Sequence, residues 1–299
     1  MNKIINADAL EAMRTLPDSC CRTCITSPPY YGLRDYGTAG QIGLEDTPDQ
    51  YIENLVKIFR EVRRVLKDDG TLWVNIGDSY TQKNLNGIPW LLAFALRSDG
   101  WYLRSDIIWQ KPNAMPESVK DRPTRAHEYI FLLSKSPRYY YDAEAVKEPA
   151  VGFYNAAPAG SAGTGKPNAR RRGNSRTFRG GGAYTHDRAQ NNSATVERES
   201  HGLAPNESGK RNRRSVWTIA TQPYKGAHFA TFPEELARPC VLAGSRPGDT
   251  VLDPFAGSGT TGAVAAQEGR DFIGIEINPD YCEIIRQRLD ACCQKGAKP

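Results

Sequence analysis

Two short segments, near opposite ends of this 299-residue chain, combine residue types that can do chemistry. Residues 26–30 read Thr-Ser-Pro-Pro-Tyr, which offers a hydroxyl, two residues without a backbone N–H and an aromatic face. Residues 253–261 read Asp-Pro-Phe-Ala-Gly-Ser-Gly-Thr-Thr, with glycines that let a ligand approach the backbone closely. The first segment suits an amine that donates hydrogen bonds, and the second suits a cofactor.

The first segment has the parts that are needed to hold an exocyclic amine of a base. The lone pair of such an amine is delocalised into the ring, so acceptors must grip its hydrogens and aim the nitrogen. Pro28 and Pro29 remove two backbone donors, and Pro28 pushes Ser27 into extended geometry, so the Ser27 oxygen and the Pro28 carbonyl are the expected acceptors. Tyr30 offers a stacking face for an extruded base, worth roughly 1–3 kcal/mol. The alternative is a proline turn that is merely packed by tyrosines.

The glycine-rich segment stands between an expected strand at 250–253 and an expected helix at 260–267. Ligands bind at the carboxyl ends of strands in parallel sheets, and Glu276 ends the next expected strand, where a carboxylate can bind two ribose hydroxyls. The segment lacks the Gly-Lys-Ser/Thr of a phosphate loop and the third glycine of a dinucleotide fingerprint. A nucleoside with a charged tail is therefore favoured over a pyrophosphate. The alternative is a tight structural turn and a surface glutamate.

Together the two segments resemble the sites of the amino-group DNA methyltransferases, in the motif order of their beta class. The resemblance implies that S-adenosylmethionine (SAM) is the cofactor, and that Asp253 faces its methionine part while Glu276 takes its ribose. Residues 6–10 and 228–233 resemble two further segments of that family, near the adenine and over the methionine end. The implied catalytic residues are Ser27, Pro28, Pro29 and Tyr30, and the implied cofactor residues are Asp8, Phe229, Ala230, Thr231, Asp253, Phe255, Gly257, Gly259, Thr260 and Glu276. No metal is expected.

The same resemblance indicates the substrate. Ser-Pro-Pro-Tyr is commoner in cytosine-N4 enzymes and Asp-Pro-Pro-Tyr in adenine-N6 enzymes, so methylation of the N4 amine of a flipped cytosine in double-stranded DNA is favoured, with N6-adenine as the alternative. RNA and protein-glutamine methyltransferases favour Asn-Pro-Pro-Tyr and the opposite motif order, which counts against them. A nucleic-acid-binding protein without catalysis is the remaining alternative. The resemblance also allows a homodimer and a restriction endonuclease that acts separately.

A basic segment interrupts the chain. Residues 151–216 hold twelve Lys/Arg and four Asp/Glu, although the whole chain has a net charge of only +5. A basic surface attracts a polyanion, whereas the plainer alternative is a solvated charged loop. We therefore expect a catalytic domain at 1–148 and 216–299, and a target-recognition insert at 149–215 that is partly disordered without DNA. Its expected DNA-binding residues are Arg170, Arg171, Arg172, Arg176, Arg179, Lys210, Arg211, Arg213 and Arg214.

Strand and helix patterns alternate on both sides of the insert, which predicts an α/β fold with a mostly parallel sheet and helices on both faces. The resemblance makes this a Rossmann-like, circularly permuted methyltransferase fold. Thr47, Pro48 and Gln50 form a helix start. Strands are expected at 3–6, 20–26, 71–76, 106–109, 129–133, 250–253 and 272–276, and helices at 9–16, from 48 to about 65, 89–97, 232–243, 260–267 and 281–293.

Composition points to an intracellular protein. Hydrophobic residues make up 39% and charged residues 24% of the chain, and it contains no apolar run of about 18 residues that could span a membrane. The N-terminus lacks the apolar stretch of a signal peptide. We expect a cytoplasmic protein of prokaryotic or phage origin with reduced thiols, in which Cys21 and Cys24 are small buried residues instead of zinc ligands.

Overall fold

The computed structural model describes residues 2–33, 35, 37–38, 40–150, 209–222 and 232–296. The chain divides into two compact units, one formed by Met1–Lys147 with Asn212–Pro299 and the other by Glu148–Arg211. In the described part of the second unit, β8 (Glu148–Pro149) pairs with β9 (Lys210–Arg211) in antiparallel orientation. The first unit contains the sheet and the helices that position the candidate site.

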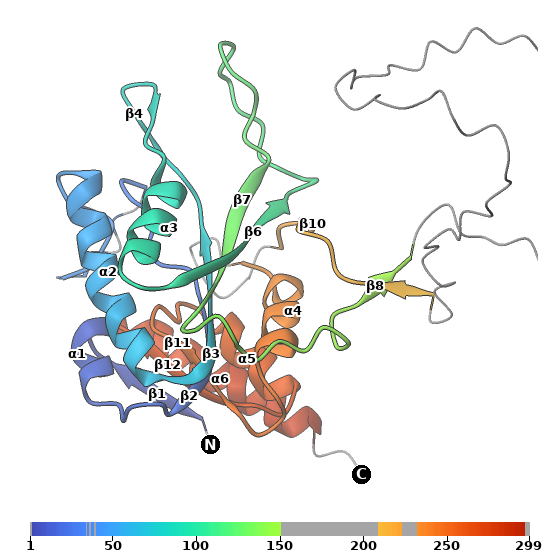
Figure 1. Ribbon diagram of the computed structural model, residues 1–299. Coiled ribbons are helices and arrows are strands. Elements are labelled where there is room, and N and C mark those ends of the chain that lie inside the picture. The colour runs from blue at the N-terminus through green and yellow to red at the C-terminus, as the bar shows by residue number, and fades with distance from the viewer. Residues whose placement is uncertain are drawn as a thin grey trace, which may run out of the picture. The chain divides into compact units, whose positions relative to one another are not determined.

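One eight-stranded sheet forms the centre of the first unit, in the order β1-β12-β11-β2-β3-β7-β6-β10 (Figure 1). All neighbouring pairs are parallel except those of β7, which is antiparallel to both β3 and β6. The predicted α/β fold with a mostly parallel sheet is thus confirmed. The strands are β1 (Lys3–Asn6), β2 (Cys21–Thr26), β3 (Leu66–Ile76), β6 (Tyr102–Gln110), β7 (His127–Ser134), β10 (Val216–Thr218), β11 (Thr250–Asp253) and β12 (Asp271–Glu276).

Helices cover both faces of the sheet. Successive residues of a strand point to opposite faces, so their side chains belong to two separate hydrophobic cores. Leu72 and Leu252 belong to the core that holds buried residues of α1 (Ala9–Arg14), α2 (Pro48–Val65) and α3 (Ile88–Ser98). Their neighbours Trp73 and Val251 belong to the core that holds those of α4 (Glu234–Gly244), α5 (Thr260–Gln267) and α6 (Pro279–Gly296). This alternation follows from the two-residue period of a strand.

Helix α2 begins as the sequence predicts. Thr47 is its N-cap, with an extended backbone, and its hydroxyl accepts a hydrogen bond from the Gln50 N–H at 3.3 Å. Pro48 occupies the first turn, where its missing N–H costs nothing. The predicted apolar face is buried, with Tyr51 and Leu55 inaccessible to solvent.

Several boundaries differ from the predicted ones. The strand predicted at 71–76 starts at Leu66 and runs through Asp69-Gly70, because Leu66 already pairs with Cys21 of β2. A Cβ atom at Gly70 would lie 2.9 Å from the Arg22 carbonyl oxygen, so this position needs a glycine because β2 and β3 approach each other closely there. The helix predicted at 9–16 ends at Arg14.

Besides β8 and β9 of the second unit, three short strands were not predicted. They are β10, which extends the sheet beside β6, and the hairpin of β4 (Tyr80–Thr81) with β5 (Asn84–Leu85). Cys21 and Cys24 are fully buried in the sheet, as expected of small core residues. Among the described residues, no helix combines the length and the apolar character needed to cross a membrane.

Candidate active site

The two chemically suggestive segments meet at one edge of the sheet. Strands β2 and β11 are parallel neighbours, so the segments that follow them leave from the same edge. The Thr26 hydroxyl donates a hydrogen bond to Oδ1 of Asp253 at 2.6 Å, and the Thr261 hydroxyl donates one to the Ile25 carbonyl at 3.2 Å. These two bonds join positions 227 and 236 residues apart in the chain.

Asp253 ends β11 with its carboxyl buried at 1% exposure. Its Oδ1 also accepts from the Phe255 N–H at 3.1 Å, whereas its buried Oδ2 has no partner among the described residues. Burial raises the pKa of Asp253 to about 7, although the Thr26 hydroxyl bond works in the opposite direction. An unpaired buried acceptor of this kind is suited to a hydrogen-bond donor of a ligand.

Gly257 contacts Glu276, which ends β12, the strand next to β11 in the sheet. Gly257 has a φ of 50°, a conformation that favours glycine, and its N–H donates to Oε2 of Glu276 at 2.8 Å. Oε1 of Glu276 accepts from the Asn278 N–H at 2.9 Å, so each oxygen keeps a further lone pair. Burial raises the pKa of Glu276. The carboxylate is thus held by backbone and can still accept from a pair of hydroxyls.

Three other residues of the glycine-rich segment are mainly packed. Gly259 is the N-cap of α5 with a φ of 79°, and a Cβ there would lie 3.0 Å from the side chain of Ile285. Thr260 is buried, and its hydroxyl accepts from Nη1 of Arg288 at 3.3 Å. The half-buried Phe255 packs on the core beneath α1–α3.

Asp8 lies where β1 ends beside β12, with Asn6 paired to Glu276. Its Oδ1 caps α1 by accepting from the N–H groups of Leu10 at 2.9 Å and Glu11 at 3.0 Å. Asp8 is therefore close to the Glu276 edge, but the structure also gives it a role in starting a helix. Phe229, Ala230 and Thr231 lie outside the described residues.

The Ser-Pro-Pro-Tyr segment is held in place by contacts with helix α2 and with the residue after β3. Ser27 is half-buried and Pro28 is buried. The Pro29 carbonyl accepts from the Tyr51 hydroxyl of α2 at 2.7 Å, which holds the turn in place. The Tyr30 ring lies against the backbone of Gly77, where an added Cβ would come within 2.6 Å of Cε2 of the ring. The position of Tyr30 therefore depends on a glycine after β3.

Three residues that sequence reasoning missed surround Ser27 and Tyr30. Asn75 Nδ2 at the end of β3 donates to the Tyr30 hydroxyl at 2.9 Å, and the Tyr30 hydroxyl donates to Oε2 of Glu128 on β7 at 2.7 Å. Lys111, just after β6, forms an ion pair with Oε1 of Glu128. Burial and the Glu128 charge raise the pKa of Tyr30. The available signal was a polar residue at each of these strand ends.

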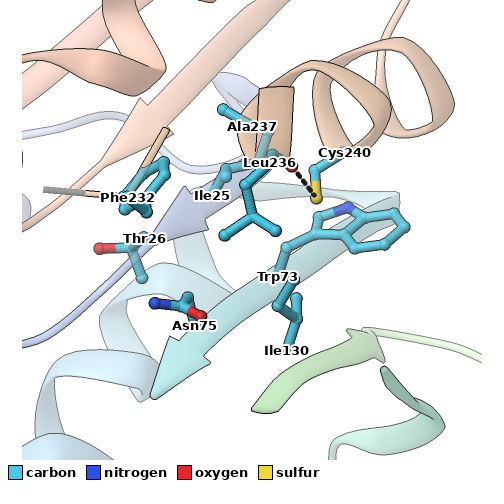
Figure 2. Close-up of a pocket in the computed structure, with 9 residues that line it drawn as sticks. All are labelled: Ile25, Thr26, Trp73, Asn75, Ile130, Phe232, Leu236, Ala237 and Cys240. Carbon is cyan, nitrogen blue, oxygen red and sulfur yellow. Dashed lines mark hydrogen bonds between the residues drawn. The ribbon is translucent and has the colours of Figure 1, made fainter. Parts of the chain in front are cut away.

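A mainly apolar pocket adjoins this cluster (Figure 2). It lies between the ends of β2, β3 and β7 and helix α4, and its lining includes Thr26, Asn75 and Phe232. Asn75 is only 6% exposed, and its Oδ1 has no partner within the described part of the chain. The pocket therefore contains an amide oxygen that can still accept a hydrogen bond.

The expected DNA-binding residues are described only in part. Arg211 pairs with Glu148 at 2.9 Å within the second unit, where Lys210 is exposed. In the first unit, Arg213 stacks its guanidinium 4.6 Å from the ring centre of Trp217, and the Arg214 carbonyl accepts from the Trp217 indole at 2.7 Å. Arg170, Arg171, Arg172, Arg176 and Arg179 lie outside the described residues.

The chain is similar in sequence and in structure to known DNA methyltransferases. Residues 21–287 match the protein family described as DNA methylase. The Type II methyltransferase M.Cfr9I of Citrobacter freundii is 47% identical over 315 residues, which cover 96% of this chain and 87% of that protein. The PvuII DNA methyltransferase (cytosine-N4-specific) has a similar structure, with a TM-score of 0.66, 19% identity and coverage of 98% of this chain and 91% of the other. The M1.HpyAVI–SAM complex is also similar, with a TM-score of 0.55, 19% identity and coverage of 97% and 100%.

Proposed function

This chain belongs to the N6/N4 DNA methylase family, and we propose that it methylates the N4 amine of a cytosine in duplex DNA with SAM as methyl donor. Membership makes it a DNA methyltransferase of the Type II restriction-modification kind, and the similar structures confirm the predicted Rossmann-like methyltransferase fold. The observation that carries the proposal is the Thr26–Asp253 hydrogen bond, which joins the segment proposed to hold the amine to the segment proposed to hold the cofactor.

The residues at the sheet edge fit SAM. When bound, SAM supplies a methyl group on a positively charged sulfur. Glu276 has lone pairs to accept from two ribose hydroxyls. The space beside Gly257 is open, since a Cβ added to this glycine would meet only a carbonyl oxygen 4.0 Å away. The unpaired Oδ2 of Asp253 can accept from an ammonium donor in the methionine part. We therefore assign the ribose to Glu276 and the methionine part of the cofactor to Asp253.

Ser27, Pro28 and Tyr30 are assigned to the target base. Ser27 Oγ and the Pro28 carbonyl accept the two amine hydrogens and thereby aim the nitrogen lone pair. Tyr30 stacks on the extruded base, while Pro29 shapes the turn through its bond with Tyr51. No strong general base is needed, because the amine becomes acidic once it is methylated and can lose a proton to water.

The choice of cytosine N4 over adenine N6 is supported by two points. Ser27 stands where adenine-N6 enzymes commonly have aspartate, and the PvuII enzyme with the similar structure is cytosine-N4-specific. The basic residues of 149–215 are proposed to bind the phosphates or guanine edges of the target sequence. A homodimer and a separately acting endonuclease remain predictions.

The test is nucleoside analysis of methylated DNA. The chain is incubated with isotope-labelled SAM and mixed-sequence duplex DNA, and the DNA is then digested and analysed by mass spectrometry. Labelled N4-methylcytosine is the expected product. Labelled N6-methyladenine would overturn the choice of base, and absence of label with a SAM-binding, folded protein would overturn the proposed reaction. Ser27→Ala should abolish turnover while SAM affinity stays normal.

A further inference from the structure

We propose that Glu128 is a positioning residue, which orients the Ser27 hydroxyl through the phenol of Tyr30 so that the serine oxygen presents a lone pair to the target amine. The inference rests on the proposed function. It concerns three residues, Asn75, Lys111 and Glu128, that the assignment of the cofactor and base contacts leaves without a role.

The sheet brings these residues together because β7 is antiparallel to its neighbours. Its first residues therefore lie at the edge where β2 and β3 end. In β7, Glu128 is on the same face as Ile130, which pairs with Asn75 of β3. Glu128 also pairs with Trp109 of β6, and Lys111 follows at the end of that strand. The neighbouring strands β2, β3, β7 and β6 thus supply the polar groups that surround the Tyr30 hydroxyl.

Hydrogen-bond directions fix the orientation of Ser27. The Ser27 hydroxyl donates to the Tyr30 oxygen at 3.5 Å, and the Tyr30 hydroxyl donates to Oε2 of Glu128 at 2.7 Å. Asn75 Nδ2 reaches Ser27 Oγ at 3.4 Å and Oε2 of Glu128 at 3.1 Å. A serine hydroxyl has one hydrogen and two lone pairs. Its hydrogen is used here, and at most one lone pair is, because the two Asn75 hydrogens are shared among three acceptors. At least one lone pair of Ser27 therefore remains for the amine.

The Glu128 carboxylate determines the direction of this chain of bonds. A carboxylate only accepts, so the Tyr30 hydrogen must point to it, and the Tyr30 oxygen is then free to accept from Ser27. Each bond polarises the next, which makes the Ser27 oxygen a better acceptor than an isolated serine. An aspartate in place of Ser27 would put a carboxylate directly on the amine, whereas here the Glu128 carboxylate acts on the amine through the hydroxyls of Tyr30 and Ser27.

The surroundings of Glu128 keep its carboxylate in place. The Lys111 and Glu128 side chains are only 19% and 14% exposed. The Lys111 ammonium also lies 4.4 Å from the centre of the Trp109 ring. Lys111 binds the oxygen that Tyr30 does not use, so the ion pair and the Tyr30 contact are separate interactions of one carboxylate. This separation allows each to be removed independently.

A double-mutant cycle tests the inference. Glu128→Gln removes the charge at nearly constant size, and Tyr30→Phe removes the hydroxyl while it keeps the stacking face. Each should lower kcat for methyl transfer about 10- to 100-fold, with KM for DNA and SAM affinity within about threefold of the wild type. Because both act through one chain of bonds, the double variant should lose no more than about threefold beyond either single variant.

Two further variants separate positioning from a structural role. Lys111→Met removes the ion pair but leaves the Tyr30–Glu128 bond, so it should lower kcat less than Glu128→Gln. Glu61→Gln, which removes a similarly half-buried ion pair with Arg64 on α2, should leave kcat unchanged. Fully additive losses in the cycle, or an equal loss in Lys111→Met, would overturn the role of Glu128.

The proposed function and this inference fail in different ways. An active wild type in which Glu128→Gln has the wild-type kcat overturns this inference alone. A folded wild type that methylates neither base overturns the proposed function and the inference with it. Methylation of adenine in place of cytosine leaves the same test applicable, because both bases present an exocyclic amine to Ser27.

Discussion

The hydrogen bond between Thr26 and Asp253 makes a quantitative prediction about stability. Thr26→Val keeps the shape of the side chain but removes a 2.6 Å bond between two groups that are each 1% exposed. A buried hydrogen bond to a neutral group contributes about 1 kcal/mol, and one to a charged group about 1.5–3 kcal/mol. Asp253 changes from the neutral to the charged form as the pH rises through about 7, because burial raises its pKa to about 7. The cost of the substitution should therefore depend on pH.

The sign follows from proton binding. With a pKa above its ordinary value, folded Asp253 holds its proton more tightly than the unfolded chain, so stability falls as pH rises from about 4 to about 7. Loss of the Thr26 bond raises this pKa further, so the fall extends to higher pH in the variant. We expect Thr26→Val to lose about 1 kcal/mol at pH 5 and about 2–3 kcal/mol at pH 9.

Urea denaturation followed by tryptophan fluorescence at both pH values measures these losses. Thr26→Ser is the matched control, because it keeps the hydroxyl and should show no added loss at pH 9. A deficit of the same size at pH 5 and pH 9, or one below about 0.5 kcal/mol at pH 9, would refute the idea that this bond holds an ionised Asp253 at the shared edge.

Further predictions concern the cofactor and the DNA. Glu276→Ala should weaken SAM binding at least about tenfold by calorimetry while the circular dichroism spectrum is unchanged, since it removes the acceptors assigned to ribose. SAM affinity should fall as pH is lowered from 8 to 6, because Asp253 gains a proton near pH 7, and Asp253→Asn should abolish this dependence. Gly259→Ala should lower the melting temperature by several degrees, because a φ of 79° strains any side chain there. Replacement of the arginines at 170–172 by alanine should weaken DNA binding and flatten its salt dependence in fluorescence anisotropy, and unchanged affinity at low salt would exclude them from the interface.

The sequence correctly predicted the helices whose starts are determined by neighbouring residues. Thr47 and Pro48 start α2 where their capping chemistry requires, and α5 runs from Thr260 to Gln267 as predicted after its glycine turn. The shared edge was predictable too, because strands in a parallel sheet present the segments after them on one side. Thr26 and Asp253 each end a predicted strand, so their meeting needed only that β2 and β11 be neighbours.

The rest of the site depends on pairing that no local pattern encodes. Glu128 precedes the predicted strand at 129–133, and nothing in that segment shows that β7 runs antiparallel between β3 and β6. That reversal brings Glu128 to the edge where Asn75 ends β3. The role of Gly77 is similarly non-local, because its absent side chain makes room for the ring of Tyr30, 47 residues earlier in the chain.

A crystal structure with bound S-adenosylhomocysteine is the most direct test of the shared catalytic edge. We expect the ribose hydroxyls to lie on the Glu276 carboxylate, the amino group near Oδ2 of Asp253, and the sulfur to be directed toward Ser27. A ligand bound elsewhere, or one whose sulfur is turned away from Ser27 and separated from it by protein, would contradict the account.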